Sequence, residues 1–297
     1  MSAPVFELSG VGKSYPFFKL EGVRIQLAPG QIMGFIGANG AGKSTTIRIL
    51  MGLIAQQCGE VRLLGHPMPE GQALAKRDVA FVSEEMRLYS GATVEQHMQF
   101  VASVVPHWDA TYAQQLLRRF NLQPQQKTKG LSHGQRMKAL VLLALARRPR
   151  LLVLDEPMTG LDPVARQEIL AELMDIVTDE ERSILFSSHN TQDVEQVSDQ
   201  ITFIDRGRII ESRDKESFLE RWRRLQLEVP AGKPLPPFAG VIDVTSSGRT
   251  AVVTTKAFTP ELPAFYNQAG AVVREVQHMT LEEIFVAEVM SSREDPS

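Results

Sequence analysis

The feature that most constrains the fold of this chain is a glycine-rich run between an apolar stretch and an amphipathic one. Residues 37–44 read Gly-Ala-Asn-Gly-Ala-Gly-Lys-Ser, which matches the pattern Gly-x4-Gly-Lys-[Ser/Thr] in full. Apolar residues 31–36 precede the run, and Ile47, Leu50 and Met51 follow it with helical spacing. A turn of this kind directs its amide hydrogens toward one point, where the helix end adds positive partial charge. The pattern therefore predicts a phosphate-binding loop in an α/β protein.

The residue types in this run suit a nucleoside triphosphate and its Mg²⁺. Lys43 would place a mobile cation on the β- and γ-phosphates and take part in hydrolysis, and the Ser44 hydroxyl can coordinate Mg²⁺. The alternative is a glycine-rich turn that binds nothing, and the strand–loop–helix context argues against it. The expected nucleotide-binding residues are Gly37, Asn39, Gly40, Ala41, Gly42, Lys43, Ser44 and Thr45.

A second chemical signal is an apolar strand that ends in two acids. Residues 151–156 read Leu-Leu-Val-Leu-Asp-Glu, and Pro157 follows at once. A buried strand of the same sheet would bring its carboxyl end beside the phosphate loop, where ligands of such sheets bind. We expect Asp155 to hold Mg²⁺, directly or through water, and Glu156 to act as general base toward the attacking water. Taken alone the pattern is weak, because many strands carry four aliphatic residues and an acid.

A third segment, Leu131-Ser-His-Gly-Gln135, points to a family. It resembles the Leu-Ser-Gly-Gly-Gln signature of the ATP-binding cassette (ABC) ATPases, and Asp155 follows it by 20 residues, as in that family. Ser132 and Gln135 also have capping-box spacing, so the alternative is a simple helix start. The resemblance implies that Ser132, Gly134 and Gln135 contact the γ-phosphate of ATP bound by a second copy, which encloses ATP at a dimer interface.

Three further residues match the family in order. Asp162, in Gly-Leu-Asp-Pro, resembles the D-loop residue that communicates across the dimer. His189, after two serines, resembles the switch histidine that contacts the γ-phosphate, although a histidine after a strand is often unremarkable. Tyr15 lies where the family has an aromatic residue that stacks on adenine. The alternative for Tyr15 is an ordinary surface or core tyrosine.

The sequence departs from the family pattern at two positions. Glu84 stands where the family usually has glutamine, and its carboxylate can still approach Mg²⁺ or the attacking water. We expect Glu84 to act as a metal ligand and in catalysis, and the alternative is a solvated charge. His133 replaces the first signature glycine and adds bulk where backbone meets phosphate. Neither departure removes a catalytic group.

Composition excludes several other classes of protein. The formal net charge of −3 argues against a nucleic-acid binder, and 43% hydrophobic with 23% charged residues is ordinary globular usage. No apolar stretch reaches the roughly 20 residues that span a bilayer. The amino terminus does not read as a signal peptide. A single cysteine, Cys58, cannot form an intrachain disulfide, and we expect it to be a small buried or half-buried hydrophobe.

The order of strand-like and helix-like stretches predicts the domain organisation. The ABC resemblance implies an α/β P-loop core with a mostly parallel sheet flanked by helices, plus antiparallel β and helical subdomains. Residues 230–237 read Pro-Ala-Gly-Lys-Pro-Leu-Pro-Pro, which neither a helix nor a central strand can contain. We therefore place the ATP-binding domain at residues 1–229, with the helical subdomain at about 85–148, and a small α+β domain at 230–297.

Local patterns give the expected elements of the core. The expected strands are 5–8, 23–27, 31–36, 61–64, 79–82, 151–155, 183–187 and 201–205. The expected helices are 45–53, 94–104, 112–120, 134–146, 164–176 and 215–221. The basic group 221–224 is read as a solvated helix end, with contact to phospholipid as the alternative.

The resemblance covers about residues 4–225, and its motif order is similar to the single-cassette ATPases of bacterial drug, lipid and peptide exporters. It implies an ATP-hydrolysing subunit that pairs with a second copy of itself or a homologous cassette. The subunit would sit on the cytoplasmic face of the membrane and drive a separate transmembrane permease through residues 86–100. One alternative is a soluble ABC ATPase of the iron–sulfur cluster assembly type. A second is a subunit that binds ATP without cleaving it.

Overall fold

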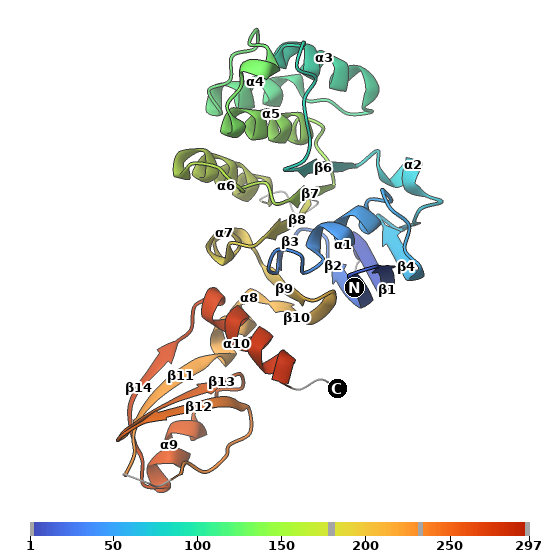
Figure 1. Cartoon of the computed structure of the whole chain (residues 1–297). Helices are drawn as coiled ribbons and strands as arrows, with labels where there is room; N and C mark the ends of the chain where they lie inside the picture. Colours follow the sequence, from blue (N-terminus) through green and yellow to red (C-terminus); the bar gives the residue numbers. More distant parts are fainter. Residues whose placement is uncertain (1–2, 178–181, 231–233, 295–297) are drawn as a thin grey trace. The chain divides into compact units, whose positions relative to one another are not determined.

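The structure is a computed structural model that describes residues 3–177, 182–230 and 234–294. The chain divides into two compact units, Met1–Ser212 and Arg213–Ser297 (Figure 1). Among the described residues, no helix has the length and apolar character needed to cross a membrane.

The centre of the first unit is a six-stranded sheet in the order β10-β9-β3-β8-β7-β6. The five strands from β9 to β6 pair in parallel, so the carboxyl ends of β3, β7 and β8 lie at one edge. All residues of these three strands are buried, which explains their continuous apolar runs. The strands are β3 (Ile32–Ile36), β6 (Val79–Ser83), β7 (Leu151–Asp155), β8 (Ser183–Ser188), β9 (Gln200–Asp205) and β10 (Arg208–Asp214).

A second, antiparallel sheet in the order β2-β1-β4-β5 packs against this core. Burial alternates along β2, which is typical of a sheet with one face in the core. β1 and β2 are both longer than the sequence predicted and meet in a tight turn at Tyr15 and Phe18. The strands are β1 (Phe6–Tyr15), β2 (Phe18–Leu27), β4 (Cys58–Leu63) and β5 (His66–Pro67).

Seven helices of the described first unit flank or adjoin these sheets. Of these, α3, α4 and α5 gather at one end of the unit in Figure 1, and both α3 and α4 pack on α5. Side chains cap the starts of all three, with capping boxes at α3 and α5. The helices are α1 (Lys43–Leu50), α2 (Gln72–Ala75), α3 (Val94–Val104), α4 (Ala110–Arg119), α5 (His133–Leu145), α6 (Pro163–Val177) and α7 (Thr191–Val197).

Over its described residues, the second unit is a four-stranded antiparallel sheet, in the order β12-β13-β11-β14, with three helices. Its own core contains Leu225, Leu227, Val253, Leu262 and Tyr266. The elements are α8 (Lys215–Arg221), β11 (Arg223–Glu228), β12 (Val241–Ser247), β13 (Thr250–Thr255), α9 (Glu261–Gln268), β14 (Val272–His278) and α10 (Leu281–Glu294).

The second unit begins earlier than the proline-rich segment indicates. The sequence places the boundary at 229/230, whereas the compact unit starts at Arg213, because β11 pairs with both β13 and β14. The reading of 221–224 as a solvated helix end is wrong for its last two residues. Arg223 is buried in β11 and donates to the carbonyl oxygens of Leu219 and Trp222, and Arg224 pairs with Glu283 at 2.7 Å.

The expectation for Cys58 is also wrong, because the residue is exposed. Cys58 opens β4 opposite Gly12, which has no side chain to cover it.

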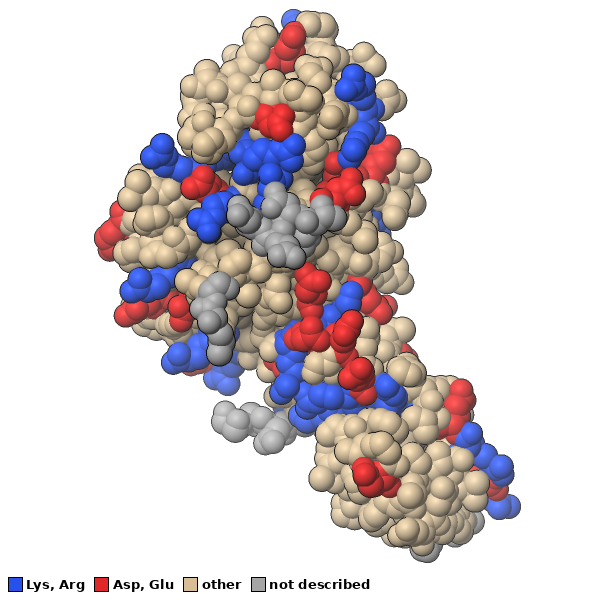
Figure 2. Space-filling view, turned by 180° about the vertical axis from the view of Figure 1, so that it is seen from behind, with Lys and Arg blue, Asp and Glu red and all other residues tan. Residues whose placement is uncertain are grey.

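The distribution of charge on the surface matches the small net charge of the sequence. Figure 2 shows basic and acidic side chains close together over much of the face in view, which is consistent with the small net charge.

Candidate functional site

The phosphate loop lies between β3 and α1, as the sequence predicts. Gly40 and Gly42 have φ values of 79° and 116°, in the left-handed region that favours glycine. A Cβ atom on Gly37 would lie 2.6 Å from the carbonyl oxygen of Ile204, so the loop also needs glycine there for space. The first turn of α1 carries no acidic residue. The loop thus ends at an uncompensated positive helix end, which suits an anion.

Lys43 lies inside this loop and is almost fully buried. Its Nζ donates to the Gly37 carbonyl oxygen at 2.7 Å and to the Ala38 carbonyl oxygen at 3.4 Å. The same atom lies 2.9 Å from Glu156 Oε1, in an ion pair whose members are 5% and 14% exposed. The loop cation and the second acid predicted from the sequence are therefore in direct contact.

Asp155 ends β7, and its Oδ1 accepts two hydroxyl hydrogen bonds. Ser44 Oγ donates to it at 3.1 Å, and Ser187 Oγ donates at 2.8 Å. Burial raises the pKa of the Asp155 carboxyl above its ordinary value, and the two hydroxyls only partly offset this effect. The site therefore holds a buried carboxylate next to a hydroxyl, where a nearby cation would be favourable.

Glu156 is held in a strained backbone position by specific contacts. Its φ is 53°, which is uncommon for a residue with a side chain, and its amide donates to Ser187 Oγ at 3.0 Å. Oε2 accepts from His189 Nδ1 at 2.8 Å and from Thr159 Oγ1 at 3.2 Å. Burial opposes ionisation of Glu156, but Lys43 and His189 outweigh it and lower the pKa of the carboxyl. Glu156 is thus held ionised, as a general base requires.

The structure brings Glu84 to the same edge of the sheet, because its amide donates to the Asp155 carbonyl oxygen at 3.2 Å. The Glu84 side chain is exposed. Its position is compatible with a role near Asp155, and its exposure is equally that of a solvated charge.

The segment 131–135 forms the start of α5 through the expected capping box. Ser132 Oγ accepts from the Gln135 amide at 3.2 Å, and Gln135 Oε1 accepts from the Ser132 amide at 3.0 Å. Gly134 faces Asp162, because a Cβ atom added there would lie 3.7 Å from Asp162 Oδ2. These residues lie apart from the phosphate loop: α5 packs beside β6, whereas α1 packs beside β4 and β7 (Figure 1).

Asp162 caps the helix that follows it. Its Oδ1 accepts from the amides of Val164 and Ala165, both at 3.0 Å, and these hydrogen bonds lower the pKa of the carboxyl. This local role accounts for the residue type without any contact across a dimer.

Tyr15 is 42% exposed at the end of β1, and Lys13 Nζ lies over its ring, 5.5 Å from the centroid. The Phe18 ring lies 6.3 Å away, and Phe18 also packs against the loop, since a Cβ atom on Gly42 would lie 2.9 Å from its Cζ. Phe17 is fully exposed in the same turn. The sequence therefore pointed to one aromatic residue where the structure gathers three.

Sequence reasoning missed two residues that organise the acids. Ser187 links Asp155 and the Glu156 amide, and Thr159 donates to the Glu156 carboxylate. Ser187 precedes His189 by two residues, and Thr159 follows Glu156 by three. Hydroxyl residues at such spacings are common, so only the fold singles them out.

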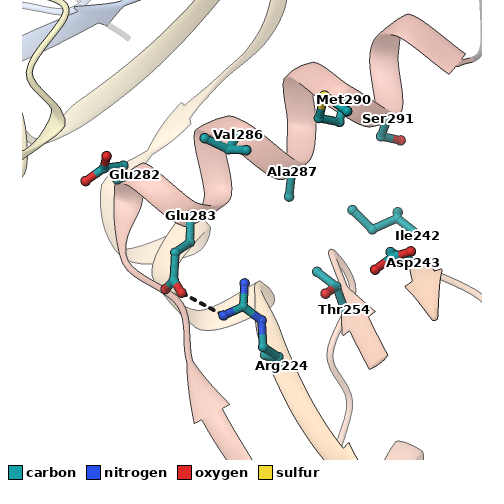
Figure 3. Close-up of a pocket in the computed structure, with 10 residues that line it drawn as sticks. All are labelled: Arg224, Ile242, Asp243, Thr254, Glu282, Glu283, Val286, Ala287, Met290 and Ser291. Atoms are coloured by element: carbon teal, nitrogen blue, oxygen red, sulfur yellow. Dashed lines mark hydrogen bonds and ion pairs between the residues drawn. The ribbon is translucent and has the colours of Figure 1, made fainter. Parts of the chain in front are cut away.

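A separate cavity of 550 Å³ lies within the second unit, between α10 and the β12–β13 edge of its sheet (Figure 3). Glu283 and Arg224 form an ion pair on one wall, and Val286, Ala287 and Met290 form an apolar wall. None of the site residues predicted from the sequence lines it.

Comparison with known proteins agrees with this geometry. A family model described as ABC transporter matches residues 20–159. The thiamine import ATP-binding protein of Rhizobium meliloti (strain 1021) is 35% identical over 196 residues, which cover 64% of this chain and 82% of that protein. The Nod factor export ATP-binding protein I of Cupriavidus metallidurans is 26% identical over 294 residues, which cover 95% of this chain and 96% of that protein.

A solved structure of an ATP-binding subunit of an ABC transporter matches with a TM-score of 0.67 and 27% identity, over 73% of this chain and 92% of that one. Nothing in these comparisons favours the iron–sulfur cluster assembly type. The phosphate loop, the paired acids and these matches together lead to one conclusion. The chain belongs to the ABC transporter ATP-binding proteins and is the ATP-binding, ATP-hydrolysing subunit of such a transporter.

Proposed function

We propose that residues of the phosphate loop, β7 and β8 form the hydrolytic site, and that two subunits enclose ATP to drive a separate exporter permease. The observation that carries the first part is the contact of Lys43 with Glu156, next to the hydrogen-bonded pair Ser44 and Asp155. A cation, a base and a metal-binding pair thus converge at the carboxyl edge of the parallel sheet. This is where ligands bind in sheets of this kind.

The donor set fits Mg²⁺. Mg²⁺ prefers oxygen ligands and keeps several waters, so one carboxylate and one hydroxyl beside substrate phosphates suffice. Asp155 would hold it, directly or through water, and Ser44 would complete the protein's share, with Glu84 as a further oxygen donor nearby. When bound, Mg²⁺ would neutralise charge on the β- and γ-phosphate oxygens.

The protein groups divide the remaining work by position. The loop amides of residues 37–45 would bind the phosphates, and Lys43 would move from Glu156 to the phosphate oxygens. Glu156, which Lys43 and His189 keep ionised in this structure, would accept a proton from the attacking water once Lys43 has moved. His189 contacts the same carboxylate and would orient it or the γ-phosphate. Tyr15 would stack on adenine.

A second copy of the chain, or a homologous cassette, would complete the site. The capped start of α5, with Ser132, Gly134 and Gln135, lies apart from the chain's own phosphate loop, which supports contact with nucleotide held by another subunit. The start of an α-helix is a favourable place for phosphate. Asp162 lies next to Gly134 and would sit at the same interface.

The permease would dock near α3, on the cytoplasmic face of the membrane. Met86, Tyr89 and Phe100 are exposed, which favours burial against a partner over packing within their own domain. A pocket of 520 Å³ next to them is lined by Arg87, Leu88, Tyr89, Ser90, Thr128, Lys129 and Arg136. Its three cations suit an acidic segment or a helix carboxyl end of the partner.

Export is supported by the Nod factor export relative, which matches nearly the whole chain and therefore includes the second unit. The thiamine import relative matches only 64% of this chain.

Light scattering on Glu156→Gln tests the dimer. The measured mass should double when ATP and Mg²⁺ are added, and should remain that of a monomer when ADP is added instead. A monomer under saturating ATP would contradict the enclosed-ATP proposal.

A further inference from the structure

His133 makes a contact that a glycine at its position could not make. It is the first residue of α5, and its half-buried imidazole points to the turn after β7. A carbonyl oxygen only accepts, so His133 Nε2 donates to the Thr159 carbonyl oxygen, at 2.8 Å. The ring lies against Gly160: a Cβ there would lie 3.5 Å from Nε2, an ordinary van der Waals contact.

Thr159 passes this contact on to the base. Its Oγ1 donates to Glu156 Oε2 at 3.2 Å, the same oxygen that His189 contacts. The Thr159 amide also closes the turn by donating to the Glu156 carbonyl oxygen at 3.4 Å. Because Glu156 has a φ of 53°, its orientation depends on such surrounding contacts.

We propose that His133 is a positioning residue that orients Glu156 through Thr159. The imidazole fixes the Thr159 backbone, and the fixed Thr159 hydroxyl holds the carboxylate at the angle that proton transfer needs. This inference rests on the proposed role of Glu156 as base. It has a consequence for the proposed dimer, in which the start of α5 would contact the nucleotide of the second copy. Contact between α5 and that nucleotide would then be linked, through His133 and Thr159, to Glu156 in the same chain, which serves the other of the two ATP sites.

The test uses the full-length chain and four substitutions. His133→Ala removes the donor and keeps a good helix former, whereas His133→Gln supplies an amide hydrogen at a similar reach. Thr159→Val removes the hydroxyl at nearly constant volume, and exposed His107→Ala is the matched histidine control. Steady-state kcat and KM, the affinity for a fluorescent ATP analogue and the melting temperature are measured for each, and for His133→Ala/Thr159→Val.

A net hydrogen bond of about 1 kcal/mol corresponds to roughly a fivefold effect, and misplacement of the base adds to it. His133→Ala should lower kcat about five- to tenfold with KM and nucleotide affinity within about twofold. His133→Gln should recover most of the loss, and His107→Ala should show none. The double variant should be no slower than Thr159→Val, because both changes break one path.

Three outcomes would overturn the proposal. The kcat losses of His133→Ala and Thr159→Val could multiply in the double variant. Alternatively, His133→Ala could have the kcat of the parent, or His133→Gln could be as slow as His133→Ala. Glu156→Gln, measured in the same series, distinguishes a wrong assignment of the base from a wrong positioning role for His133. If Glu156→Gln turns over like the parent, the proposed base is wrong and this inference falls with it. If Glu156→Gln is inactive and His133→Ala is normal, only the positioning role is overturned.

Discussion

Lys43 Nζ lies 2.9 Å from Glu156 Oε1, so the cation of the phosphate loop and the acid after β7 form one largely buried ion pair. A triphosphate in the loop would bring anionic oxygens that compete with Glu156 for this ammonium. Lys43 and Glu156 therefore set each other's charge environment, so a substitution at either residue also changes the electrostatics of the other.

The first prediction concerns stability without nucleotide. Lys43→Met should destabilise the protein toward the lower end of about 3–5 kcal/mol, because Glu156 is left buried without its main cation but keeps His189. The same change in a Glu156→Gln background should cost far less. Urea denaturation of the parent, both single variants and the double variant measures the difference. An equal cost in both backgrounds would show that the ion pair does not form.

The second prediction concerns pH. The folded pKa of Glu156 lies below its ordinary 4.5, so the ionised group stabilises the fold above that pH, and this contribution is lost as pH falls through the folded value. The free energy of unfolding of the parent, relative to Glu156→Gln, should therefore decrease from about pH 6 to pH 3. Asp155 gives the opposite sign, because its folded pKa is raised from 3.8.

Asp155→Asn is the matched control for this pH dependence. It should be more stable than the parent at neutral pH without Mg²⁺, and the advantage should shrink as the pH is lowered through the raised folded pKa and Asp155 is protonated. Denaturation curves across the same pH range give both results. A parent curve parallel to that of Glu156→Gln would contradict the lowered pKa.

The third prediction concerns the base-stacking residue. Tyr15→Ala should weaken ATP, ADP and GTP binding alike by about 1–3 kcal/mol, since every base offers a π-face. Phe17→Ala is the control, because Phe17 is exposed in the same turn. Calorimetric titration of each nucleotide separates them. Loss of affinity in Phe17→Ala with normal binding in Tyr15→Ala would move the stacking site to Phe17.

The fourth prediction concerns coupling. Leu88→Glu should leave basal ATP hydrolysis and the melting temperature of the isolated subunit close to those of the parent, and should reduce co-purification with the permease. Leu88 is half-buried beside a basic pocket, so the added charge disrupts an apolar contact rather than the domain core. Exposed Leu74→Glu, in α2, is the matched control and should co-purify normally. Unfolding of the isolated Leu88→Glu protein would place Leu88 in the subunit's own core.

The five parallel strands of the central sheet could be predicted because they are buried along all or most of their length, whereas the more exposed edge strand β10 was not predicted. A buried parallel strand reads as a continuous apolar run, and the expected strand 151–155 coincides with β7. β11 was missed because its alternation is carried by arginine, glutamine and glutamate: Arg223, Leu225 and Leu227 face inward, while the residues between them are half-exposed. A buried arginine hides the apolar period that marks a strand.

The candidate site also contains some residues that could be predicted from the sequence and others that could not. Lys43, Ser44, Asp155, Glu156 and His189 could be predicted, because motif spacing fixes which residues follow strands that end at one edge. The roles of Ser187 and Thr159 could not, because each depends on a hydroxyl that reaches a carboxylate across a turn or from a neighbouring strand. The contact of His133 with Thr159 joins residues 26 positions apart, and no local pattern encodes it.

The most direct test of the central claim is the ATP hydrolysis rate of Glu156→Gln with Mg²⁺, beside the exposed control Glu275→Gln. Removing a positioned general base typically costs about 10²–10⁴ in rate, so Glu156→Gln should be nearly inactive while it binds ATP as tightly as the parent. Glu275→Gln should hydrolyse ATP normally. A turnover of Glu156→Gln within about threefold of the parent would contradict the assignment of Glu156 as the base.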